Sequence, residues 1–125
     1  MFRTMLEVAL GGAVGASARY LTYAAFARGG EAAFPWATLS VNVFGSFLMG
    51  VLVILLDETG LSRHSPVLLT GVLGGFTTFS AFSLDAMKLW DHGSTGLALA
   101  YVIGSVAVSI IALALGMSLT REWFA

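Results

Sequence analysis

The chain has 125 residues, of which 58% are hydrophobic and only 10% are charged, and its mean hydropathy is +0.89. A soluble domain carries about 25% charged residues, so this composition excludes an ordinary soluble enzyme. The net charge of −1 argues against nucleic acid as a partner. The absence of cysteine excludes disulfides and thiolate chemistry. The composition therefore predicts a small membrane protein.

Four apolar stretches are separated by short charged turns. A membrane-spanning helix needs about 20 apolar residues, and the chain is predicted to be an all-α membrane protein with one domain, residues 1–125. We do not expect a signal peptide, because the first apolar stretch is too long and lacks a small-residue cleavage site before a polar mature chain. The four predicted transmembrane helices cover approximately residues 4–27, 35–57, 66–90 and 95–120.

The positive charges divide almost evenly between the two sides of the predicted bundle. One side carries Arg3, Arg63 and Arg121, and the other carries Arg28 and Lys88. A fixed orientation normally shows a clear Lys/Arg excess on the cytoplasmic side. Two interpretations stay open. Either Arg19 or helix packing fixes the orientation, or the chain inserts both ways up and forms a dual-topology, antiparallel homodimer.

Polar residues lie inside the first two predicted spans. Arg19 is well inside the first span, where a guanidinium is costly unless it is paired or faces water. It either anchors the helix by snorkelling or draws anions toward a pore. In the second span, Asn42 lies near the middle and Thr38 near the entrance. The Asn42 amide either joins helices through hydrogen bonds or turns its NH₂ donors toward a polar pathway.

The third predicted span has a poor helix sequence at its middle. Gly74 and Gly75 are followed by the β-branched residues Thr77 and Thr78, so we expect the third helix to be broken there. A break inside a membrane frees backbone carbonyls, which is tolerated only where protein buries them or where they line an aqueous site. Freed carbonyl oxygens suit a hard cation such as Na⁺.

Two phenylalanines follow this break at a spacing that places them on one helix face. Phe79 and Phe82 are three residues apart. Such a pair usually faces lipid or fills a core, but the polar neighbours Thr78, Ser80 and Ser83 make that interpretation less favoured here.

The fourth predicted span carries a stripe of hydroxyl groups. Tyr101, Ser105 and Ser109 recur every four residues and therefore share one helix face. A single serine in a span usually bonds back to its own helix, but three aligned hydroxyls favour a polar track. The combined set offers hydroxyls, an amide and the positive edges of aromatic rings, with no carboxylate or lysine at its centre. This chemistry favours a small anion.

Three motifs occur in order along the chain. They are Gly11-Gly12-x-x-Gly15-Ala16-x-x-Arg19-Tyr20, then Thr38-Leu39-x-Val41-Asn42-x-x-Gly45-x-Phe47, then Gly71-x-x-Gly74-Gly75-Phe76-Thr77-Thr78-Phe79-Ser80-x-Phe82. These motifs resemble those of the Fluc (CrcB) family of fluoride channels. With the fourth-helix track, the resemblance covers most of the chain. One departure is Ala81, where the family usually has threonine.

The resemblance implies a passive, fluoride-selective channel in the cell (inner or plasma) membrane. It implies an antiparallel homodimer with two pores that exports fluoride from the cytoplasm, and it implies no enzymatic activity. By the same resemblance, Arg19 and Thr38 belong to the vestibule, and the carbonyls of Gly74 and Thr77 hold a structural Na⁺ at the dimer centre. The implied fluoride pathway comprises Asn42, Phe79, Ser80, Phe82, Tyr101, Ser105 and Ser109.

Two other functions compete with this interpretation. A small proton-coupled multidrug exporter also has four helices and dual topology, but it needs a membrane-embedded carboxylate. Glu7 is the only candidate, because Asp85 is expected at a helix end. Alternatively, the chain is a non-transporting packing subunit, whose glycine-rich faces contact partner helices.

Overall fold

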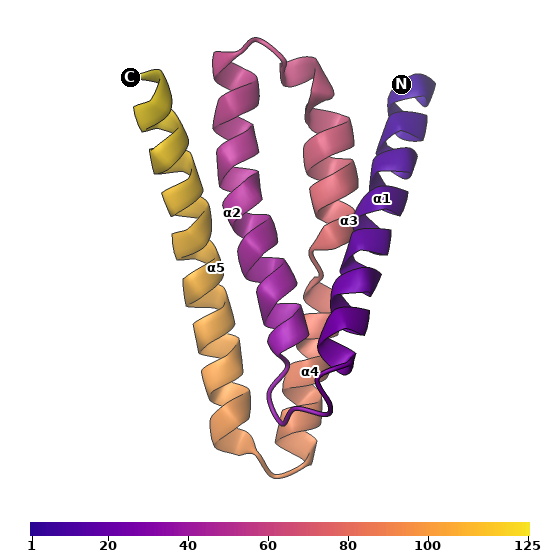
Figure 1. Ribbon diagram of the computed structural model, residues 1–125, viewed down its shortest axis with the longest axis vertical. Helices are drawn as coiled ribbons and strands as arrows, with labels where there is room; N and C mark the ends of the chain where they lie inside the picture. The colour runs from indigo at the N-terminus through magenta and orange to yellow at the C-terminus, as the bar shows by residue number, and fades with distance from the viewer.

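A computed structural model describes all residues, 1–125, and the protein is entirely helical. Its long helices lie side by side, with both termini at the same end (Figure 1). The elements are α1 (Phe2–Ala27), α2 (Trp36–Glu58), the short 3₁₀-helix η1 (Ser62–His64), the π-helix η2 (Pro66–Leu73), α3 (Gly74–Phe76), α4 (Phe79–Asp91) and α5 (Thr95–Phe124).

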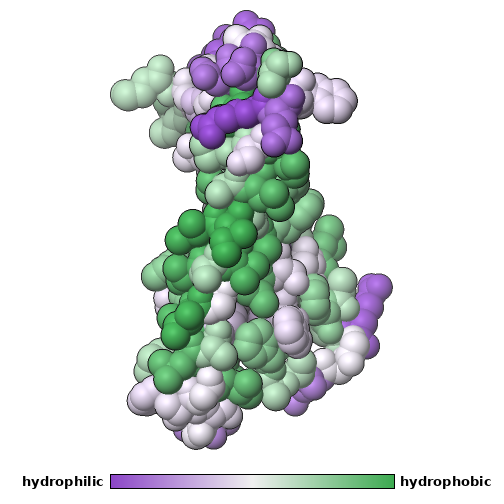
Figure 2. Space-filling model, turned by 90° about the vertical axis from the view of Figure 1, so that its left-hand side faces the viewer, coloured by the Kyte–Doolittle hydropathy of each residue, from purple (hydrophilic) through white to green (hydrophobic).

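Three helical segments are long and apolar enough to cross a membrane, namely Trp36–Glu58, Ser62–Asp91 and Thr95–Phe124. The first helix, α1, has 26 residues and is long enough, but it is not among the three. It holds three charged residues, Arg3, Glu7 and Arg19, together with several glycines and alanines, which lower its hydropathy. Figure 2 shows a hydrophobic middle band with hydrophilic residues gathered at the two ends of the molecule.

Glycines let the helix backbones approach closely at two interfaces. The first helix packs along η2 and α3, and a Cβ atom at Gly15 would overlap the carbonyl oxygen of Val72. The fifth helix packs along α2, where a Cβ at Gly50 or Gly116 would likewise overlap backbone of the facing helix. These positions serve the small-residue packing that membrane helices use in place of a hydrophobic driving force.

The third membrane segment is irregular in its first half. It begins as the π-helix η2, whose wide turns are rare and often accompany functional sites. After α3, Thr77 (φ −79°, ψ 157°) and Thr78 (φ −150°, ψ 120°) are extended, and α4 begins at Phe79. The break predicted from the sequence is therefore confirmed, and the ribbon shows it as a short non-helical connection between α3 and α4 (Figure 1).

Few residues of the single chain are shielded from its surroundings. Only 16 of 125 residues are buried, and large apolar side chains such as Phe44, Ile103 and Ile111 are exposed. A soluble protein rarely exposes so much contiguous apolar surface. This surface is suited to contact with lipid or with other membrane helices.

Candidate functional site

A cavity of about 330 Å³ lies between α2, the break, α4 and α5. None of its 13 lining residues is charged. Its apolar walls include Met49, Val106, Ile110 and Leu113, whereas six lining residues bring hydroxyl or amide groups. These six are Asn42, Ser46, Thr77, Thr78, Ser105 and Ser109. The cavity is thus polar in places but carries no fixed charge.

At the break, a side chain of α2 replaces the missing helical hydrogen bonds. The Asn42 Nδ2 group donates to the Thr78 carbonyl oxygen over 2.9 Å, and the Thr78 N–H donates to Asn42 Oδ1 over 2.8 Å. The Thr78 hydroxyl caps the next helix, since its Oγ1 accepts the Ala81 N–H over 3.1 Å. A β-region residue whose side chain accepts an N–H three residues ahead is the usual helix N-cap.

These bonds remove the ordinary partners of two carbonyls. A continuous helix would direct the Thr78 N–H to the Gly74 carbonyl and the Ala81 N–H to the Thr77 carbonyl. Both N–H groups instead donate to side-chain oxygens. The carbonyls of Gly74 and Thr77, on which the family resemblance places a Na⁺, are therefore among those that lose their regular donors at the break. No group of three or more histidine and carboxylate side chains could hold a metal elsewhere in the chain.

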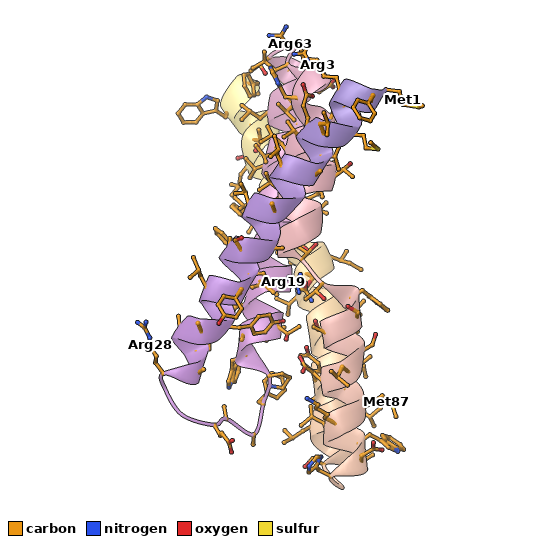
Figure 3. All side chains as sticks on the ribbon, turned by 90° about the vertical axis from the view of Figure 1, so that its right-hand side faces the viewer. Met1, Arg3, Arg19, Arg28, Arg63 and Met87 are labelled. Atoms are coloured by element: carbon orange, nitrogen blue, oxygen red, sulfur yellow. The ribbon has the colours of Figure 1, made fainter.

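Arg19 caps the helix that ends at the break. Its Nε donates to the Gly75 carbonyl over 3.1 Å and joins α1 to α3. A cation at a helix C-terminus is favoured by the partial negative charge there. The labelled Arg19 side chain lies at the narrow middle of the molecule, where the α4 end diverges from α1 (Figure 3). The sequence allows Arg19 either to anchor its helix or to attract anions toward a pore. In the structure its guanidinium has a backbone partner, the Gly75 carbonyl.

The two phenylalanines after the break form a partly covered aromatic cluster. The ring centroids of Phe79 and Phe82 are 5.5 Å apart, and Phe82 lies 5.1 Å from Tyr101. Both phenylalanines line the cavity, but Phe82 is 8% exposed whereas Phe79 is 77% exposed. A large ring so exposed beside a cavity leaves one side of that cavity open in the single chain.

The hydroxyl stripe of α5 divides into two parts. Ser105 and Ser109 line the cavity, and Ser109 Oγ is buried with no hydrogen-bond partner. Tyr101 lies outside the lining and donates its hydroxyl to Asp85 Oδ2 over 3.2 Å. Ser80 also lies outside the lining, and its exposed side chain is 3.4 Å from Thr78 Oγ1. The expected pathway residues thus gather around the cavity, with Tyr101 and Ser80 beside it.

A second polar cluster, formed by Tyr23, Thr38, Asp85 and Tyr101, joins α1, α2, α4 and α5. Thr38 Oγ1 donates to Asp85 Oδ2 over 2.6 Å, and the hydroxyls of Tyr23 and Thr38 are 2.8 Å apart. Because Thr38 has a single hydroxyl proton, Tyr23 is the donor of that pair. We call these four residues the tyrosine–aspartate cluster.

The expectation for Asp85 was wrong. The charge pattern of the sequence predicts Asp85 at a helix end, whereas α4 continues to Asp91 and places Asp85 within its middle turns. The meeting of the residues of the tyrosine–aspartate cluster depends on four separate elements, so no local pattern could reveal it.

Charged residues gather beside the second half of α4 and not around the polar cavity. A second cavity of about 620 Å³ is lined by the carboxylates of Glu31 and Asp85, by Lys88, and by His92. Glu7, the carboxylate considered for proton coupling, pairs with Arg3 over 3.0 Å near the start of α1. Glu7 therefore has a local partner and is not among the residues that line the polar cavity.

Comparison with known proteins gives a consistent family. Residues 6–117 match the family described as "CrcB-like protein, Camphor Resistance (CrcB)". A protein named "Fluoride-specific ion channel FluC" from Cereibacter sphaeroides (strain ATCC 17029) is 57% identical over 125 residues, which is the whole of both chains. Proteins of the same name from Ruegeria sp. (strain TM1040) and Paracoccus denitrificans are 52% and 50% identical, over 97% and 100% of both chains.

Proposed function

Because the chain belongs to the CrcB family, we propose that it is a passive fluoride channel of the cell membrane and not an enzyme. The observation that carries the proposal is the uncharged cavity of about 330 Å³ with the buried, unpartnered Ser109 Oγ in its wall. A buried hydroxyl without a partner costs free energy in the empty protein. A desolvated anion passing the cavity would give that hydroxyl an acceptor.

The walls of the cavity match the needs of a small anion in transit. The Ser109 and Ser105 hydroxyls can donate hydrogen bonds, and the edges of Phe79 and Phe82 carry partial positive charge. No lysine or arginine lines the cavity, so an anion would not be held too tightly to leave. No carboxylate lines it either, which favours a channel over proton-coupled exchange with a cationic drug.

The proposed channel is an antiparallel dimer with two pores. One chain leaves Phe79 77% exposed and the cavity open on that side, so a second copy is needed to close it. The near-equal division of positive charge between the two ends supports insertion in both orientations. Two copies related by a two-fold axis would each complete one such pathway. In this arrangement α1 crosses the membrane as the fourth span, packed along η2 and α3.

We further propose a structural Na⁺ at the centre of this dimer. The carbonyls of Gly74 and Thr77 are suited to bind Na⁺, because the N–H groups that would bond to them in a continuous helix donate to side-chain oxygens instead. Carbonyl oxygens are ligands for hard cations. Gly74 is exposed in the single chain, which leaves room for a second copy beside it. When bound, Na⁺ would supply charge that draws the partial negative charges of both copies together.

The proposed direction of transport is export. A channel without a coupled energy source moves fluoride down its electrochemical gradient, and an inside-negative potential contributes about 2.3 kcal/mol per 100 mV for each charge. Fluoride that enters acidified cells as neutral HF would thereby leave as the anion.

The direct test is fluoride efflux from liposomes that contain the purified protein alone. We expect rapid fluoride release that needs no proton gradient, with chloride release at the level of empty liposomes. Release that requires a proton gradient would overturn the channel and favour an exchanger. Absence of any anion flux would favour a packing subunit.

The dimer and its cation need separate tests. Cysteines introduced near opposite ends of α5 should crosslink head to tail between copies in membranes, and crosslinks between like ends only would refute the antiparallel arrangement. Replacing Na⁺ by N-methyl-D-glucamine should lower the thermal stability of the dimer, because a ligand bound only to the folded assembly stabilises it. Equal stability in both cations would remove the Na⁺ site.

A further inference from the structure

We propose that Asn42 is a positioning residue, which holds Thr78 extended and thereby fixes where α4 begins. The sequence alone left Asn42 as either a link between helices or a donor toward a polar pathway. The inference rests on the proposed fluoride pathway only for its effect on flux. Its structural part concerns the break itself.

The geometry is that of a strand partner supplied by a side chain. Asn42 Nδ2 donates to the carbonyl of Thr78, and Asn42 Oδ1 accepts the N–H of the same residue, over 2.9 and 2.8 Å. In antiparallel sheets, two residues exchange both backbone bonds in this way. The dihedral angles of Thr78, φ −150° and ψ 120°, are those of a strand. The two backbone groups also fix which end of the Asn42 amide is which.

The amide acts on both sides of the break. Upstream, it takes the Thr78 N–H that a continuous helix would give to the Gly74 carbonyl. Downstream, it holds the residue whose hydroxyl caps α4 through the Ala81 N–H. One side chain on α2 therefore keeps a carbonyl free and sets the first turn of α4.

The position of α4 in turn decides where the aromatic rings lie. Phe79 is the first residue of α4, and Phe82 is in its first turn. Thr78 is buried, so its displacement would be transmitted to these rings through packed neighbours. The expected contribution of Asn42 to fluoride flux is therefore the placement of Phe79 and Phe82.

The experiment compares the conformation of Thr78 in fluoride-free solution with fluoride flux. The full-length protein is labelled with ¹³C,¹⁵N-threonine and reconstituted, and the Cα and Cβ shifts of Thr78 are measured by NMR together with its amide exchange. The variants are Asn42→Ala, which loses both bonds, and Asn42→Asp, which keeps the acceptor for the Thr78 N–H. Ser109→Ala is the matched control, because Ser109 lines the same cavity without a hydrogen bond in the structure.

We expect extended-type Thr78 shifts in the wild-type protein and altered shifts in Asn42→Ala, with at least a tenfold loss of flux. If the freed N–H finds no new acceptor, its exchange should also become about tenfold faster. Asn42→Asp should move Thr78 less than Asn42→Ala does. Ser109→Ala should lower flux and leave Thr78 unchanged.

Two results would overturn the inference. Helical Thr78 shifts in the wild-type protein would do so without any variant, even if Asn42→Ala fails to fold. Unchanged Thr78 shifts in Asn42→Ala with reduced flux would mean that Asn42 acts by contacting the anion. If the wild-type protein carries no fluoride at all, the proposed function fails, whereas the threonine spectra still decide the role of Asn42.

Discussion

The polar groups on two walls of the same cavity differ in their hydrogen bonding. On the α2 wall, the Asn42 amide is bonded twice to Thr78 at 2.9 and 2.8 Å. On the α5 wall, Ser109 Oγ is shielded from water but has no partner. Buried polar groups in native proteins are almost always paired. The difference suggests that the α2 wall maintains the architecture, while the α5 wall keeps a donor available for an anion.

The largest loss of fluoride flux is expected when the aromatic rings beside the cavity are replaced. Phe82→Ile and Phe79→Ile should each lower fluoride flux about a hundredfold, corresponding to about 2.7 kcal/mol, because the aliphatic side chain lacks the positive ring edge. The measurement is efflux from liposomes, with size-exclusion chromatography to verify that each variant elutes as the wild-type protein does. Normal flux in both variants would remove these rings from the pathway.

The α2 wall can be disturbed without touching a polar group. A Cβ atom at Gly45 would overlap the Thr77 methyl group and lie 3.3 Å from the Phe76 ring. Gly45→Ala should therefore displace the break and reduce flux about tenfold, corresponding to about 1.4 kcal/mol.

Gly96→Ala is the control for this change, since a Cβ there meets nothing within 4 Å. It should leave flux at the wild-type level. Equal flux in Gly45→Ala and Gly96→Ala would show that the break tolerates movement, and the contrast between the two walls would lose its basis.

On the α5 wall we expect a smaller loss of fluoride flux, without a loss of stability. Ser109→Ala should lower flux about fivefold, corresponding to about 1 kcal/mol, because one donor is lost. The free energy of unfolding should stay equal or rise slightly, because the variant no longer buries an unpaired hydroxyl. Thermal denaturation in fluoride-free buffer checks the second part. Reduced stability would mean that Ser109 Oγ has a partner in the folded protein.

The sequence predicted local features of this site well and long-range contacts poorly. The break could be predicted because Gly74, Gly75, Thr77 and Thr78 disfavour a helix within one short stretch. The all-helical fold followed from the spacing of charges. By contrast, the bonds from Asn42 to Thr78 join residues 36 apart. Periodicity cannot show which backbone group a polar side chain reaches across two helices.

Asp85 illustrates the same limit. The charges that follow it in the sequence suggested the end of a span, and this placed it at a helix terminus. The carboxylate instead accepts hydrogen bonds from Thr38, 47 residues away, and from Tyr101, 16 residues away.

The smallest effect on flux is expected in the tyrosine–aspartate cluster, which lies outside the polar cavity. Tyr23→Phe removes the hydroxyl that donates to Thr38 over 2.8 Å, while Thr38 keeps its own bond to Asp85. The free energy of unfolding should fall by about 1 kcal/mol, with flux within about twofold of wild type. A loss of flux comparable to that of Ser109→Ala would extend the pathway along α5 to Tyr101, because Tyr101 shares the Asp85 carboxylate with Thr38. The cluster would then belong with the α5 wall and its available donors, and not with the bonded architecture around Asn42.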